Sequence, residues 1–326
     1  MDISIVIALY NERESLPELL DRIDAVLTPL SLRYEVILID DGSQDGSWSF
    51  IAERAEQMKQ EEQTASLGRI RGIRFRRNYG KSAALFCGFE AAKGDVVITM
   101  DADLQDSPDE LPELYQMIQS GKYDLVSGWK KRRHDGVLSK NLPSKLYNAT
   151  ARMVTGIKLH DMNCGLKAYR KEVIKSIEVY GEMHRYIPYL AKTAGFGRIG
   201  EKVVQHQARK FGKSKFGISR FVNGYLDLLS LWFLSTFGKK PMHFFGLFGS
   251  LTFLGGFACT VTIIVKKLIA QSQGLFFRAV TDQPLFYLAL VALIVGMLLF
   301  LAGFLGELIS RNSPERNKYL VDKRIE

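Results

Sequence analysis

The stretch of sequence that decides the fold is residues 96–108, VVITMDADLQDSP, in which an apolar run ends in two aspartates. A short uninterrupted apolar run predicts a strand that is buried on both faces, as the strands of parallel sheets are. Asp101 and Asp103 then follow the carboxyl end of this strand, where ligands bind in such sheets. Two carboxylates at this spacing, with Gln105 close behind them, offer hard oxygen ligands that suit Mg²⁺ or Mn²⁺.

Outward from this stretch, strand-like and helix-like patterns alternate up to about residue 130. Strands are predicted at residues 3–9, 34–39, 70–75, 96–100 and 125–127, and helices at 16–27, 45–58, 82–92 and 108–118. This alternation predicts an α/β domain whose mostly parallel sheet is covered on both faces. Ser15 is expected to cap the first helix and Asp106 the last one.

Polar residues also follow two other predicted strands. Tyr10-Asn11-Glu12 follows the first strand, and Asp40-Asp41-Gly42-Ser43 follows the second. A carboxylate in the second group either accepts hydrogen bonds from a nucleotide or closes a turn through an Asx interaction. Gly80-Lys81-Ser82 is not a P-loop, because Phe75 stands where the first glycine of that motif is required. Lys81 is still expected to meet a phosphate at a helix start.

Composition excludes several classes of protein. The 326 residues are 47% hydrophobic and 24% charged, which rules out intrinsic disorder and low-complexity chains. Three distant cysteines and five histidines without metal-ligand spacing support neither a disulfide framework nor a zinc site. The net charge is +9, but the basic run 130–133 has no interleaved aromatics, so anionic lipid or phosphate-bearing substrates explain it better than nucleic acid.

Two segments after residue 240, 241–265 and 283–306, contain no Lys, Arg, Asp or Glu. Each is long enough to cross a hydrocarbon core of ~30 Å at ~1.5 Å per residue. The predicted membrane helices are 241–266 and 283–307 of the region 241–310, and their glycines indicate close helix packing. Lys239 and Lys240 precede the first span and basic residues follow the second, against Lys266, Lys267, Arg278 and Asp282 in the connecting loop. The N-terminus lacks the basic region of a signal peptide. The N-terminal domain and a basic tail, 311–326, are therefore expected in the cytoplasm.

The segment 218–240 repeats apolar residues at helical spacing, with polar residues on the other face. This pattern predicts an amphipathic helix in the membrane interface, and the alternative is a helix that packs on the core. Residues 1–217 would then form the catalytic domain.

Taken together, ALYNE (8–12), DDGS (40–43), NYGK (78–81) and DADLQDSP (101–108) resemble the family 2 glycosyltransferases with the GT-A fold. Three further features narrow this resemblance to a subgroup of the family. They are the motif DxxCGLKAYR (161–170), the later Arg209 with GKSKFG (212–217), and the two predicted spans. The chain resembles polyprenyl-phosphate glycosyltransferases of the bactoprenol glucosyltransferase kind, which are related to dolichol-phosphate mannose synthase. Ala8 departs from the pattern, since many relatives have proline there.

This resemblance implies an inverting, metal-dependent transfer of a hexose to polyprenyl (undecaprenyl) phosphate at the cytoplasmic face of the inner membrane. The expected donor is UDP-glucose, the lipid-linked product would serve lipopolysaccharide or O-antigen, and the enzyme would be a homotetramer. The alternatives are GDP-mannose or an amino-arabinose donor, a non-catalytic nucleotide- or lipid-binding adaptor, and a transporter. Processive synthesis is disfavoured because two spans are too few to enclose a channel.

The resemblance also assigns roles to single residues. The donor would be held by Ala8, Tyr10, Glu12, Asp40, Asp41, Lys81 and Ala102. The metal, Mg²⁺ or Mn²⁺, would be held by Asp101, Asp103 and Gln105, and phosphate groups by Arg132, Arg209, Ser214 and Lys215. Asp103 and Asp161 would be catalytic, Asp161 in the position of a base. A phosphate monoester, with a second pKa near ~6, is already largely dianionic at neutral pH, so the alternative is that Asp161 only orients groups.

Overall fold

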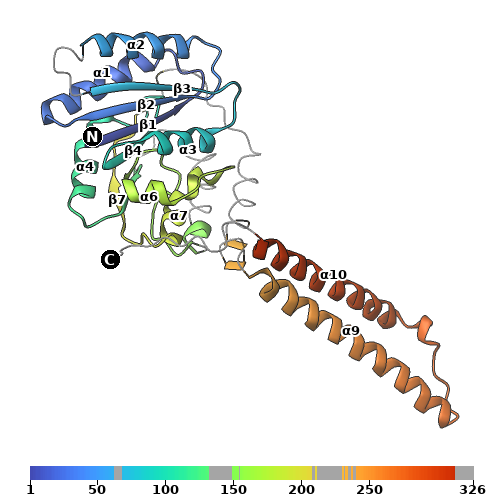
Figure 1. Ribbon diagram of the computed structural model, residues 1–326. Coiled ribbons are helices and arrows are strands. Elements are labelled where there is room, and N and C mark those ends of the chain that lie inside the picture. The colour runs from blue at the N-terminus through green and yellow to red at the C-terminus, as the bar shows by residue number, and fades with distance from the viewer. Residues whose placement is uncertain are drawn as a thin grey trace. The chain divides into compact units, whose positions relative to one another are not determined.

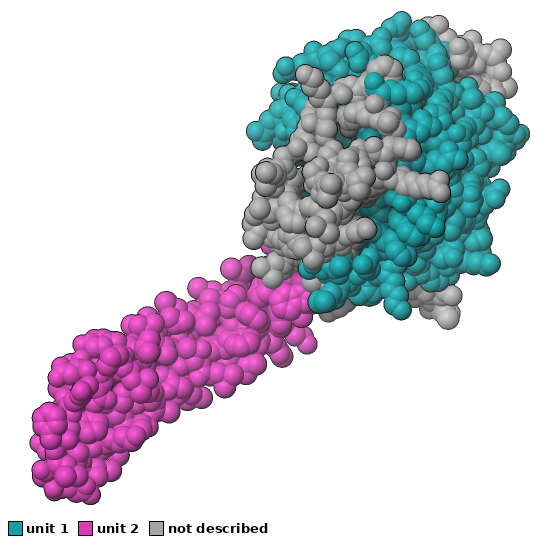
Figure 2. Space-filling model, turned by 180° about the vertical axis from the view of Figure 1, so that it is seen from behind, with its two compact units in different colours: residues 1–228 teal, residues 229–326 magenta. Residues whose placement is uncertain are grey.

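The computed structural model describes residues 1–61, 68–131, 149–153, 155–207, 210, 230, 232–233, 236–237 and 240–312. The chain divides into two compact units, residues 1–228 and 229–326 (Figure 2). The predicted domain limit at residue 217, most of the amphipathic segment 218–240 and nearly all of the basic tail lie outside the described residues.

Seven strands in the described part of the first unit form one sheet (Figure 1). They are β1 (Ile3–Leu9), β2 (Tyr34–Asp40), β3 (Gly68–Arg74), β4 (Val96–Asp101), β5 (Leu125–Trp129), β6 (Lys167–Arg170) and β7 (Ile199–Val203). Their order is β3-β2-β1-β4-β6-β5-β7, and β6 alone runs antiparallel to its neighbours. The prediction of a mostly parallel sheet is confirmed, and the five predicted strands are all present within two residues of their expected ends.

Helices pack on both faces of this sheet. They are α1 (Leu16–Leu27), α2 (Ser47–Glu61), α3 (Lys81–Ala91), α4 (Leu111–Gln119), α6 (Lys171–Ser176) and α7 (Ile187–Thr193). Alternate residues of β1, such as Ile5, join one core with side chains of α1, α2 and α4. On the opposite face α3 approaches so closely that a Cβ on Gly88 would lie 2.3 Å from Val6 Cγ1. Burial on both faces explains why the central strands are mostly apolar, and why the Ser4 and Glu35 side chains within them are hydrogen-bonded to each other.

The structure corrects the predicted cap of the first helix. Ser15 precedes α1, but its hydroxyl makes no capping bond to the helix amides. The Ser15 Oγ instead donates to the carbonyl oxygen of Glu12 at 2.9 Å. The hydroxyl therefore closes the loop that leaves β1.

The predicted cap at Asp106 is also wrong. The next residue, Ser107, accepts a hydrogen bond from the Asp109 amide at the start of a short 3₁₀ turn, Pro108–Glu110, that leads into α4. Asp106 forms an isolated β-bridge with His206, and its side chain is fully buried. The side chain is thus committed to the interior and not to a helix end.

The described part of the second unit contains two long apolar helices, α9 (Pro241–Ser272) and α10 (Pro284–Asn312). Both are long and apolar enough to cross a membrane, judged by length and composition alone. Each begins within one residue of the predicted span and extends beyond its predicted end.

Glycines allow these two helices to approach each other. A Cβ on Gly249 would lie 2.7 Å from the Phe300 nitrogen, and a Cβ on Gly256 would lie 2.7 Å from the Ala289 oxygen. A Cβ on the neighbouring Gly255 would meet no described atom within 4 Å. The close packing that the sequence predicts at these glycines is therefore present within a single chain.

Candidate functional site

The candidate site lies at the edge of the sheet where the parallel strands end. The register places Leu9 beside Asp40 and Ala8 beside Asp101. The ends of β1, β2 and β4 therefore meet at one edge (Figure 1). The structure brings together the three polar clusters that the sequence places after these strands, with Tyr10 and Glu12 directly beyond β1.

Asp101 is half-buried at the end of β4, with a cation beside it. The Lys81 ammonium group, which extends from the first residue of α3, donates to Asp101 Oδ1. Burial alone would raise the pKa of the Asp101 carboxyl, but Lys81 and Lys130 outweigh burial and hold this pKa far below its usual value. The group is therefore a permanent carboxylate.

Asp103 lies two residues further, directly before a strained turn residue. Leu104 has a φ of 58°, a left-handed conformation that a bulky side chain rarely adopts. This turn brings the Gln105 amide to 3.2 Å from Asp103 Oδ1, to which it donates. The backbone strain thus accompanies a fixed orientation of the second carboxylate.

Asp40 and Asp41 both make contacts within the protein. Asp40 Oδ1 accepts the Ser43 amide at 2.8 Å, so the turn closed by an Asx interaction is formed. The two Asp41 oxygens accept the amides of Tyr79 and Gly80 at 2.7 and 2.9 Å. Burial raises the Asp41 pKa. Asp41 therefore anchors the loop that starts α3, and a nucleotide role for either aspartate stays a prediction.

Asp161 is buried, and a residue that the sequence analysis missed holds its backbone. Glu201 Oε1, on β7, accepts the amides of His160 at 2.7 Å and of Asp161 at 3.2 Å. Glu201 Oε2 lies 2.6 Å from His160 Nδ1, and that imidazole stacks on Trp129 with ring centroids 4.1 Å apart. Glu201 stands in a weakly apolar strand, so nothing in the sequence pattern singles it out.

Two buried lysines near the site were missed as well. Lys130 Nζ lies 2.7 Å from Asp106 Oδ1, and although burial opposes the charge, Asp106 raises the Lys130 pKa above its usual value. Lys167 is buried and donates to the Cys164 carbonyl oxygen, and burial lowers the Lys167 pKa. Burial also raises the Cys164 pKa to about 12, which makes the thiol unreactive. Nothing in the charged sequence KAYR of β6 signalled that Lys167 would be buried.

The oxygen atoms of these side chains fit a divalent cation whose coordination the substrate would complete. No three His, Cys, Asp or Glu side chains in the described ranges are grouped so as to hold a metal by themselves. Asp101 and Asp103 supply two carboxylates, and Mg²⁺ commonly takes one or two together with substrate phosphates and water. The Lys81 ammonium on Asp101 shows that a positive charge is stable there. The predicted phosphate ligands Arg132, Arg209, Ser214 and Lys215 lie outside the described residues.

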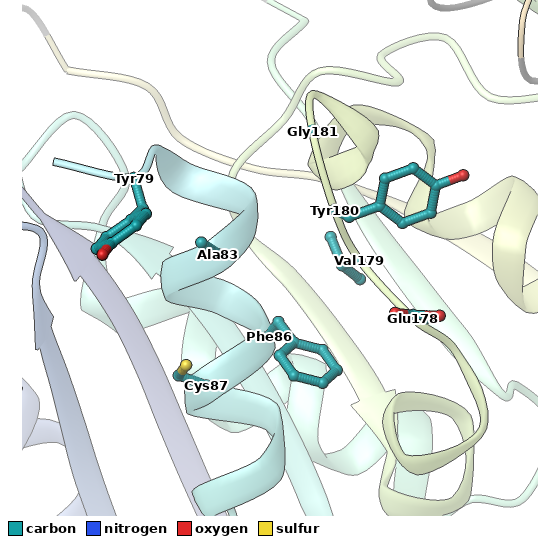
Figure 3. Close-up of a pocket in the computed structure, with 8 residues that line it drawn as sticks. All are labelled: Tyr79, Ala83, Phe86, Cys87, Glu178, Val179, Tyr180 and Gly181. Atoms are coloured by element: carbon teal, nitrogen blue, oxygen red, sulfur yellow. The ribbon is translucent and has the colours of Figure 1, made fainter. Parts of the chain in front are cut away.

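A pocket of about 250 Å³ lies elsewhere, beside the outer surface of α3 (Figure 3). It is lined by Tyr79, Ala83, Phe86, Cys87, Glu178, Val179, Tyr180 and Gly181. None of the side chains predicted to hold donor or metal is among them. The acidic edge of the sheet, and not this pocket, is the candidate site.

Residues 4–178 match the family model described as Glycosyl transferase family 2. The chain belongs to this family. It is 35% identical to dodecaprenyl-phosphate galacturonate synthase of Rhizobium johnstonii, over 95% of this chain and 88% of the relative. It is 36% identical to undecaprenyl-phosphate 4-deoxy-4-formamido-L-arabinose transferase of Aeromonas hydrophila, over 99% of this chain and 94% of the relative. The resemblance to polyprenyl-phosphate glycosyltransferases of family 2 is confirmed.

Two solved structures share the fold of this chain. Mannosyl-3-phosphoglycerate synthase from Rubrobacter xylanophilus matches with a TM-score of 0.55 at 17% identity, over 72% of this chain and 74% of that one. Glucosyl-3-phosphoglycerate synthase from Mycobacterium tuberculosis matches with a TM-score of 0.51 at 21% identity, over 72% and 79%. The predicted GT-A fold is confirmed, and the chain is a glycosyltransferase. Its two apolar helices, together with relatives named for polyprenyl phosphates, indicate a membrane-associated enzyme.

Proposed function

We propose that this glycosyltransferase moves one sugar from a nucleotide donor to a polyprenyl phosphate at the cytoplasmic face of the inner membrane, with inversion at the anomeric carbon. The observation that carries the proposal is the pair Asp101 and Asp103 at the end of β4, beside the ends of β1 and β2. The two apolar helices and the names of two relatives support a lipid acceptor.

The acceptor needs no base in this reaction. A phosphate monoester with a second pKa near ~6 is largely dianionic at neutral pH, so one of its oxygens is already a nucleophile. That oxygen forms a bond to the anomeric carbon while the bond from this carbon to the nucleotide diphosphate breaks. We therefore assign Asp161 the task of orienting groups, with its backbone held by Glu201.

The main obstacle is repulsion between two anionic substrates. Asp101, Asp103 and Gln105 would hold Mg²⁺ or Mn²⁺, which when bound supplies positive charge to the diphosphate. Lys81 would bind a phosphate beside it. Arg132, Arg209, Ser214 and Lys215 would bind the remaining phosphate groups, because fixed cations stabilise developing negative charge.

The donor nucleotide would be held by Ala8, Tyr10, Glu12, Asp40, Asp41, Lys81 and Ala102. We retain UDP-glucose as the donor to test first, since it follows from the resemblance in the sequence motifs. The two relatives are named for galacturonate and for a formamido-arabinose, so the matching nucleotide sugars are the next candidates. GDP-mannose completes the panel.

The test uses the full chain in lipid nanodiscs that contain undecaprenyl phosphate. Each nucleotide sugar is added with Mn²⁺ or Mg²⁺, and the glycolipid is detected by mass spectrometry alongside the release of nucleotide diphosphate. We expect one donor to give a sugar phosphate lipid, and Asp103→Asn to reduce its rate by at least about 100-fold, because residues that only orient metal ligands already cost ~10–100-fold. Nucleotide binding without turnover for every donor would favour the non-catalytic adaptor instead.

The assembly and the cellular role are further parts of the proposal. We propose a homotetramer that delivers its glycolipid to lipopolysaccharide or O-antigen synthesis. Native mass measurement of the enzyme in nanodiscs tests the first statement, and a monomeric mass would contradict it. Loss of the modified glycan in a deletion strain tests the second.

A further inference from the structure

Gly165 contacts the Asp101 carboxylate at a distance that leaves no room for a side chain. An ideal Cβ on Gly165 would lie 2.4 Å from Asp101 Oδ2, 2.6 Å from Cγ and 2.7 Å from Oδ1. Contacts below 3.0 Å are essentially never made by a Cβ atom, so any other residue forces something to move. Gly165 is not among the residues with a positive φ. The position therefore requires glycine because of the carboxylate and not because of its backbone conformation.

The backbones on both sides of this contact are fixed. Thr99 Oγ1 donates to the Gly165 carbonyl oxygen at 2.8 Å, and the next residue, Leu166, accepts the Gly128 amide at 2.9 Å. The backbone of Asp101 is paired with Ala8 of β1 in the centre of the sheet. The movable part is the Asp101 side chain, whose carboxylate ends next to Gly165.

We infer that Gly165 is a positioning residue for the metal site: its missing side chain sets the direction in which the Asp101 carboxylate points. This inference rests on the proposed function, in which Asp101 is a metal ligand. It explains the glycine of the DxxCGLKAYR motif, for which the assigned roles offer no reason. A methyl group at this position turns the carboxylate away from the cation while the strands stay in place.

The test compares Gly165→Ala with Gly200→Ala in the full chain in detergent. Gly200, the second residue of β7, is a matched control because a Cβ there would be crowded to a similar degree. It would lie 2.7 Å from the Tyr123 ring, which has no part in the candidate site. Mn²⁺ binding is measured by electron paramagnetic resonance, with and without UDP, and folding by the melting temperature. We expect Gly165→Ala to weaken Mn²⁺ binding about tenfold or more, the range for residues that orient metal ligands. Its melting temperature stays at or above that of Gly200→Ala, whose Mn²⁺ binding is normal.

A double variant separates positioning from general damage. In an Asp101→Asn background, adding Gly165→Ala causes no further loss of Mn²⁺ binding, because both changes act on one carboxylate. If Asp101→Asn binds Mn²⁺ weakly, either of two results would overturn the inference about Gly165 while leaving the proposed function intact. The first is normal Mn²⁺ binding by Gly165→Ala, and the second is a melting temperature of Gly165→Ala below that of Gly200→Ala. Normal binding by Asp101→Asn would overturn the metal role in the proposed function as well.

Discussion

Each of three lysines near the acidic edge has its own oxygen partner: Lys81 meets Asp101, Lys130 meets Asp106, and Lys167 meets the Cys164 carbonyl. They differ in exposure. The Lys81 side chain is 34% exposed, whereas that of Lys130 is 12% exposed and Lys167 is buried. Of these three cations, Lys81 is the one free to leave its partner when a metal and a diphosphate arrive.

Replacement of Lys81 by methionine should therefore have opposite effects on metal and on nucleotide. Without nucleotide, Mn²⁺ should bind about fivefold more tightly, since a partly exposed ion pair of ~1 kcal/mol no longer competes for Asp101. UDP should bind more weakly, because its phosphate loses a cation. Titration of Mn²⁺ and of UDP by calorimetry measures both, with the exposed Lys122→Met as control. Unchanged Mn²⁺ affinity would show that Lys81 and the metal do not share this carboxylate.

At the scale of elements, Glu35 ties the first three strands together from within. Its Oε1 accepts Ser4 Oγ of β1 at 2.6 Å and the Lys93 amide at 2.8 Å, and its Oε2 accepts Arg71 of β3 at 2.8 Å. Burial opposes the charge, but these hydrogen bonds and the Arg71 charge lower the pKa of the Glu35 carboxyl. A charged group with this many partners stabilises the sheet as long as it stays ionised.

Glu35→Gln should lower the free energy of unfolding by about 2 kcal/mol at neutral pH, because Arg71 loses its carboxylate partner and the new amide donates where an acceptor is needed. A carboxyl whose pKa is lower in the folded state contributes stability above its unfolded pKa of about 4.3, and this stability is lost as the pH falls through the folded value. The difference between wild type and variant should therefore shrink below about pH 4. Denaturant titration of the full chain at pH 7 and pH 3.5 measures it.

An exposed ion pair supplies the control for that experiment. Asp21 pairs with Arg54 at 2.9 Å, and their side chains are 67% and 34% exposed. Asp21→Asn should change the free energy of unfolding by less than about 0.5 kcal/mol. Equal losses for both variants would contradict the role given to Glu35.

The glycines of α9 allow a second element-scale prediction. Gly256→Leu should force α9 and α10 apart, because its Cβ would lie 2.7 Å from the Ala289 oxygen, whereas Gly255→Leu has open space. We expect Gly256→Leu to lower the melting temperature of the second unit in detergent, measured by helical circular dichroism. The neighbouring variant should melt as wild type does. Equal melting of the two variants would show that the helices do not depend on this contact.

Strands and helices whose buried residues form a regular apolar pattern can be predicted from the sequence. β1, β2 and β4 are apolar runs, and their polar ends had to meet because parallel strands end at one edge. β6 and β7 were missed, since KAYR and IGEKV carry charges and owe their pairing to distant strands. Glu201 and Lys130 were missed for a related reason: their partners lie far away along the chain, and no local pattern reports such contacts.

At the scale of the whole molecule, charge predicts how the chain is oriented in the membrane. On the proposal that α9 and α10 both cross the membrane, their outer ends lie on one side, where Lys240 precedes α9 and basic residues follow α10. The short segment between the helices is therefore expected outside the cytoplasm. A cysteine at Leu275, which is 62% exposed in this segment, should react with an impermeant maleimide on intact cells. A cysteine at Lys122 should react only after lysis, and the reverse pattern would contradict the cytoplasmic catalytic unit.

The reversed direction of β6 has a consequence for how such enzymes diversify. The register pairs Ser127 in the middle of β5 with Lys167 at the start of β6. The chain thus leaves and re-enters the sheet at the same rim, and the parts of the connection outside the fixed contacts of Lys130, Asp161 and Gly165 can gain, lose or exchange residues without shifting any strand. Insertions in this one connection can in this way accumulate at one rim, on a scaffold that is inherited unchanged.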